Sequence, residues 1–148
     1  MVVIWTALLA ASLVIATVLI HYEVLRATSR FVATVAIAAR SRILLVLAGI
    51  FTAHLLEVFL YALAYYLMSD HFGLGSIRGT TGGVFVDYFY FSITCYTTLG
   101  MGDVFPSGAM RIVAGIEALN GFVLIGWSTS FTYLAMERFW RVADERSR

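Results

Sequence analysis

The residues with the clearest chemical potential form one short run, Thr97-Thr98-Leu99-Gly100-Met101-Gly102-Asp103. Glycine adopts left-handed backbone conformations without a Cβ penalty, so Gly100 and Gly102 let the chain alternate between right- and left-handed residues. Such alternation points consecutive carbonyl oxygens the same way, and a dehydrated monovalent cation needs several oxygen ligands at once. The segment therefore predicts a cation site lined by Thr98, Leu99, Gly100, Met101 and Gly102.

Ionisable side chains inside apolar runs form a second group of candidates, because each costs roughly 2.5 to 3.5 kcal/mol at the centre of a membrane helix. His54 and Glu57 share a helical face with Tyr61 and Tyr65, and the pair Glu117 and Asn120 has similar spacing. Two interpretations stay open: hydrogen bonds between helices, or a sensor of pH or metal. Neither pair provides a full set of metal ligands.

An enzymatic function is not expected from these residues. His54 and Glu57 would need a nucleophile or metal triad at the same depth, whereas Ser92 and Cys95 lie in a different, outer segment. We therefore assign no catalytic residues. Cys95 is the only cysteine, which excludes an intrachain disulfide.

The composition indicates a membrane protein. Of the 148 residues, 61% are hydrophobic and 13% charged, far from the balance of a soluble domain. The net charge is only +1 and no long charge run occurs, so nucleic acid is not an expected partner, whereas the lipid bilayer is.

Three apolar segments are long enough to cross a bilayer, which takes roughly 20 helical residues. We expect an N-terminal transmembrane helix at 1–22, a second helix at 43–68 and a third at 109–140. Residues 23–42 form an amphipathic connector that either lies on the inner leaflet or extends the first helix. A glycine-rich external loop at 69–83 and a tail at 142–148 complete the chain.

A short aromatic helix is expected at 84–97, too short to span but long enough to enter the membrane part-way. Arginines favour the cytoplasmic side, and most lie between the first two spans or after the third. The N-terminus is therefore expected outside and the C-terminus inside.

The run 97–103 resembles the selectivity filter of potassium channels, Thr-Thr-Val-Gly-Tyr-Gly-Asp, at five of seven positions. The order of span, short helix, filter and final span is similar to the pore module of that family over 43–141, about two thirds of the chain. The arrangement also resembles small bacterial two-pore-domain-like channels with one extra N-terminal span. The resemblance implies an all-α membrane protein with three transmembrane helices, a re-entrant pore helix at 84–97 and a filter at 98–103.

Each chain carries one such segment, and one strand cannot encircle an ion, so we expect four chains to form a homotetramer. The resemblance implies that this tetramer conducts monovalent cations, potassium in preference, passively across the bacterial inner membrane. Potassium would bind at Thr98, Leu99, Gly100 and Met101, and no cofactor is expected apart from these permeant ions. Five residues would support the filter from behind: Tyr90, Phe91, Thr94, Thr97 and Asp103.

Met101 departs from the family pattern, in which a tyrosine hydrogen-bonds outward from this position. Methionine is flexible and lacks that hydroxyl, so a less selective cation channel and a non-conducting scaffold subunit remain as alternatives. Gly121 lies close to the hinge of the family's inner helix, but close helix packing would equally explain a glycine there. His54, Glu57, Glu117 and Asn120 are candidates for gating or sensing.

Overall fold

The computed structural model describes residues 2–79 and 84–145. Three long helices, one short helix and two very short strands make up this part of the chain: α1 (Val2–Thr34), α2 (Ala39–Asp70), β1 (Ile77–Arg78), α3 (Phe85–Tyr96), β2 (Phe105–Pro106) and α4 (Met110–Glu145). Met1, residues 80–83 of the expected loop and residues 146–148 of the expected tail lie outside the described residues.

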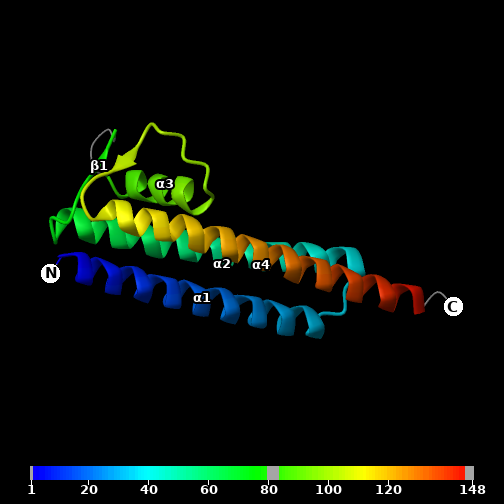
Figure 1. Ribbon diagram of the computed structural model, residues 1–148. Coiled ribbons are helices and arrows are strands. Elements are labelled where there is room, and N and C mark those ends of the chain that lie inside the picture. Colours follow the sequence, from blue (N-terminus) through cyan, green and yellow to red (C-terminus); the bar gives the residue numbers. More distant parts are fainter. Residues whose placement is uncertain (1, 80–83, 146–148) are drawn as a thin grey trace.

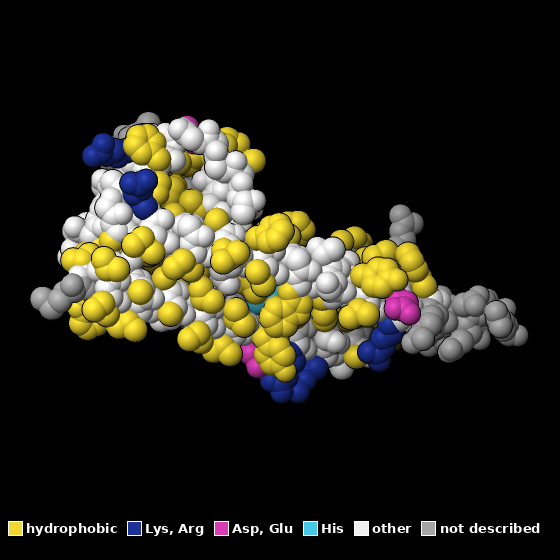
Figure 2. Space-filling view, in the orientation of Figure 1, with side chains coloured by type: hydrophobic (Ala, Val, Ile, Leu, Met, Phe, Trp, Pro, Cys, Tyr) yellow, Lys and Arg dark blue, Asp and Glu magenta, His cyan; other side chains and the backbone are white. Residues whose placement is uncertain are grey.

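The long helices lie side by side in an elongated bundle, in which α2 runs opposite to α1 and α4 (Figure 1). Each contains a segment long and apolar enough to cross a membrane, over Val2–Thr34, Ser41–Asp70 and Met110–Trp140. On the face in Figure 2, charged side chains lie at the end that carries α3 and in the half that carries the C-terminus, with a hydrophobic stretch between them. The protein is therefore an all-α membrane protein.

The first helix is longer than expected, since α1 continues past residue 22 to Thr34. Residues 23–34 contain neither glycine nor proline, so nothing in the local sequence ends the helix there. The expected connector 23–42 is instead divided among the end of α1, a link at 35–38 and the start of α2. Of the two interpretations of this connector, the structure favours an extension of the first helix.

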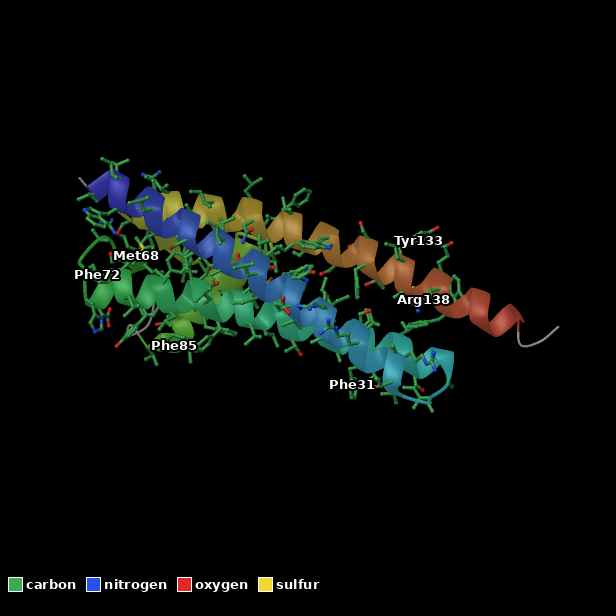
Figure 3. All side chains as sticks on the ribbon, turned by 90° about the horizontal axis from the view of Figure 1, so that it is seen from below. Phe31, Met68, Phe72, Phe85, Tyr133 and Arg138 are labelled. Atoms are coloured by element: carbon green, nitrogen blue, oxygen red, sulfur yellow. The ribbon has the colours of Figure 1, made fainter. Side chains whose placement is uncertain are left out.

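The two ends of the bundle differ. Figure 3 shows Met68 and Phe72 where α2 ends beside the start of α1, and Phe31 and Arg138 toward the opposite end. The short helix α3 packs against α2 and α4 at the end that holds Met68. Helix α3 is thus separated from the end near Phe31 and Arg138 by most of the length of the bundle.

A small antiparallel ribbon, absent from the sequence-based expectation, ties the loop between α2 and α3 to the segment that follows residues 98–103. Ile77 pairs with Pro106 and Arg78 with Phe105. Gly79 has a φ of +91°, and a Cβ there would collide with the backbone carbonyl of Asp103. The ribbon therefore holds the far end of residues 98–103 close to the loop.

Candidate functional site

Helix α3 leads directly into the 98–103 segment. The amide of Thr98 donates to the carbonyl of Cys95 at 2.9 Å, and that of Gly100 donates to Thr94 at 3.1 Å. These bonds satisfy carbonyls at the C-terminal end of α3 that have no partner within the helix. The start of the segment is therefore anchored to α3 through the backbone.

The backbone of this segment alternates in handedness. Thr98, Gly100 and Gly102 have φ values of +57°, +52° and +81°, whereas the intervening Leu99 and Met101 have no positive φ. Thr98 is the only non-glycine residue with positive φ among the described residues. A β-branched residue is an outlier there, at a cost of about 1–3 kcal/mol, and such strain concentrates at functional sites.

Within a single chain the 98–103 segment has little around it. The side chains of Leu99 and Met101 are 57% and 64% exposed, and nothing lies within 4 Å of a Cβ placed on Gly100 or Gly102. The segment is therefore open on the side away from α3.

Tyr90 supports the far half of the segment. Its hydroxyl donates to Asp103 Oδ2 at 2.8 Å and lies 3.5 Å from Met101 Sδ. The bond to the carboxylate raises the pKa of Tyr90, which keeps the phenol protonated as the donor. Asp103 Oδ1 accepts a bond from the amide of Val104.

The other expected support residues lie in α3 or at its end, and their side chains contact that helix or α2. Phe91 is buried, with its ring 5.0 Å from that of Tyr65. The hydroxyls of Thr94 and Thr97 donate to carbonyls within α3, so the link from Thr94 to the segment is its own carbonyl, which accepts from Gly100.

Two of the expected sensing residues, His54 and Glu57, belong to a buried polar group that we call the histidine cluster: His21, His54, Glu57, Tyr96 and Ser128. His21 Nδ1 lies 2.8 Å from Glu57 Oε1, and His54 Nδ1 lies 3.2 Å from Glu57 Oε2. The Tyr96 hydroxyl also donates to Glu57 Oε2. The cluster therefore joins all three long helices to the last residue of α3.

Glu117 and Asn120, the other expected pair, bond to different partners rather than to each other. Glu117 accepts from Ser92 at 2.6 Å and from Tyr65 at 2.5 Å. Asn120 donates to Thr17 at 2.8 Å and lies 3.3 Å from the Tyr61 hydroxyl. These bonds run between helices, which favours a structural role for both residues.

Gly121 lies where α4 packs on the end of α3. A Cβ at this position would collide with the backbone carbonyl of Tyr96. Close packing therefore accounts for this glycine without a hinge.

Sequence reasoning missed His21, Thr17 and Ser128 as members of these clusters. A signal for the first two existed, because the buried residues of α1 recur at helical spacing and include both: Thr6, Ala10, Leu13, Thr17, His21, Leu25 and Val32. His54 and Glu57 by themselves do not form a full set of metal ligands. His21 adds a third residue, and the ligand atoms of the three all lie within 4.8 Å of one another.

Comparison with known proteins identifies the class that this fold and segment define. A family model described as "Ion channel" matches residues 53–138, more than half of the chain. The match covers most of α2, all of α3, the 98–103 segment and most of α4. The chain therefore belongs to this ion channel family.

No curated protein and no solved structure matched the chain. The family assignment supports an integral membrane protein that passes ions rather than an enzyme.

Proposed function

We propose that the chain is one subunit of a homotetrameric channel that passes monovalent cations down their gradient, potassium in preference to sodium. The observation that carries this proposal is the alternating backbone of the 98–103 segment, with positive φ at Thr98, Gly100 and Gly102. Such a backbone presents consecutive carbonyl oxygens in place of the hydration shell of an ion. Its location between α3 and α4 matches the order of elements in a pore module.

Potassium would bind to the carbonyl oxygens of Thr98, Leu99, Gly100 and Met101, with Gly102 completing the filter. The Thr98 hydroxyl adds an oxygen at the inner end. Each chain supplies one such strand, so four chains around a shared axis are needed to surround an ion. The exposure of Leu99 and Met101 in the single chain is consistent with cover by neighbouring subunits.

In this proposal α3 is the re-entrant pore helix. Its 12 residues span about 18 Å, which is less than the bilayer core. Its carbonyl end leads into the filter, so the negative end of its dipole would favour a cation below. Irregular backbone at membrane depth is tolerated only when protein surrounds it, and a tetramer would provide that environment.

The proposed orientation places α3 and the filter near the external face and the C-terminus in the cytoplasm of a bacterial inner membrane. Support comes from arginine placement, because Arg26, Arg30 and Arg42 lie in the half of the bundle away from α3.

A second candidate, a cation channel without potassium preference, is favoured by the contact between Tyr90 and Met101. One phenolic hydrogen cannot serve two acceptors fully, and the 2.8 Å bond to Asp103 leaves only a weak 3.5 Å contact to the sulfur. Residue 101 is thus held less firmly than a residue with a hydroxyl partner would be.

The deciding experiment is current measurement with purified full-length protein in lipid bilayers, with potassium on one side and sodium on the other. We expect a reversal potential that follows the potassium gradient, and block by barium. Reversal near zero would favour the non-selective channel. No current from assembled protein would identify a non-conducting scaffold and overturn the proposal.

A further inference from the structure

We propose that His21, His54 and Glu57 bind a divalent transition metal of the zinc class inside the helix bundle. Imidazole nitrogen and carboxylate oxygen are ligands that zinc prefers in proteins. All three residues offer such an atom, and these atoms lie within 4.8 Å of one another. Because His21 belongs to α1 and the other two to α2, the metal would join the extra N-terminal helix to the remainder of the channel.

The three ligand atoms lie near one another, within 4.8 Å, and a bound metal would draw them closer. The Nδ1 atoms of both histidines face the Glu57 carboxylate, His21 at 2.8 Å from Oε1 and His54 at 3.2 Å from Oε2. Neighbouring ligands around a tetrahedral zinc lie about 3.3 Å apart when the bonds to the metal are about 2.0 Å. Three residues leave one position of a tetrahedral zinc unfilled. The Tyr96 oxygen lies 2.8 Å from His54 Nδ1 and bonds to Glu57, so this oxygen or a water would be the fourth ligand.

Ser128 provides the outer support that metal-binding histidines require. Its Oγ lies 3.3 Å from His21 Nε2 and 3.0 Å from His54 Nε2. When both Nδ1 atoms bind a metal, both neutral rings carry their hydrogen on Nε2, and one hydroxyl oxygen accepts both bonds with its two lone pairs. Without a metal, both Nδ1 atoms can carry the ring hydrogen and donate it to Glu57 or Tyr96. Both Nε2 atoms are then acceptors, and the single hydrogen of the Ser128 hydroxyl can serve only one of them.

Charge also favours a cation here. The Glu57 side chain is 0% exposed, in the middle of a membrane-spanning helix. A buried carboxylate is costly unless a cation pairs with it, and in the described part of the chain its ion-pair partners are the two histidines alone. A divalent ion bound by both neutral rings would compensate this charge directly.

The histidine cluster reaches the surface of the single chain at His54. The His54 side chain is 19% exposed, and Figure 2 shows histidine surface at mid-length among hydrophobic side chains. The Trp127 ring lies 5.2 Å from that of His21 and is itself partly exposed. His54 therefore marks the point at which the cluster reaches the surface of the chain, within the hydrophobic stretch.

Metal binding is best measured on tag-free, full-length protein in detergent after chelator treatment. Titration with Zn²⁺ alone, followed by calorimetry and metal analysis after desalting, should give one ion per chain. Titration with Co²⁺ should produce the intense visible absorption of a tetrahedral site, which Zn²⁺ then removes. Absence of stoichiometric Zn²⁺ binding to the unmodified protein would overturn the proposal.

Variants locate the site. His21→Gln and Glu57→Gln should each abolish the Co²⁺ absorption, and Ser128→Ala should weaken Zn²⁺ binding roughly 10- to 100-fold. The matched controls are His71→Gln, an exposed histidine at the end of α2, and Glu117→Gln, a buried carboxylate outside the cluster; both should retain binding. Retained binding in folded His21→Gln or Glu57→Gln protein would contradict the assignment. These measurements need no ion current, so their outcome is independent of the proposed conduction.

Discussion

At residue 98 a threonine holds a backbone conformation normally left to glycine. Its φ of +57° is positive like those of Gly100 and Gly102, so the alternation of the backbone already begins at residue 98. The strain persists because hydrogen bonds from Thr98 to Cys95 and from Gly100 to Thr94 hold the chain on both sides. At the residue scale, therefore, backbone conformation defines the shape of the segment.

Replacement of Gly100 by alanine tests this dependence. The left-handed conformation costs a non-glycine residue roughly 1–2 kcal/mol, so Gly100→Ala should abolish potassium flux while the protein still assembles. The matched control is Gly73→Ala, because Gly73 has nearly the same φ, +57°, and equally open surroundings but lies in the loop between α2 and α3. Potassium uptake into proteoliposomes measures the flux. Equal flux in both variants would contradict the role of residue 100.

The choice of residue 101 should set selectivity. Met101→Tyr would place a hydroxyl where the sulfur now makes only a weak contact with Tyr90, and a firmer filter should raise the potassium-to-sodium permeability ratio severalfold. Reversal potentials under bi-ionic conditions measure this ratio. Leu99→Val, a smaller change at the neighbouring position, should alter it little. An unchanged ratio in Met101→Tyr would refute the explanation.

At the scale of elements, buried polar side chains define how the helices meet. Asn120 of α4 reaches Thr17 of α1, and Glu117 of α4 reaches Ser92 of α3. Between membrane helices there is little hydrophobic driving force, so such bonds and close backbone contacts position the elements. The contact of α4 with the end of α3 therefore locates the start of the 98–103 segment.

Gly121→Ala should disturb that contact. Its new Cβ would meet the carbonyl of Tyr96, and overpacking of this kind costs about 1–3 kcal/mol, so the thermal midpoint in detergent should fall. Gly115→Ala, on the same helix with nothing within 4 Å of the added Cβ, serves as the control and should leave the midpoint unchanged or higher. A midpoint in Gly121→Ala equal to that of the control would show that the close contact is not limiting.

At the scale of the whole molecule, the single chain leaves residues 98–103 uncovered on one side. Native mass spectrometry from detergent should therefore detect complexes of four chains, with no stable monomer at concentrations that support flux. A monomer or dimer that conducts would exclude a filter shared by four subunits.

Hydropathy and backbone freedom are local properties, so the three apolar helices, the short helix before the glycine run and the roles of Gly100 and Gly102 could be predicted from the chain alone. The sequence also placed His54 and Glu57 on one face. Three pairings could not be predicted: His21 completes their cluster, Ser92 is the partner of Glu117, and Ile77 pairs with Pro106. Those pairings join residues far apart in the chain, so helix packing, rather than any local pattern, brings them together.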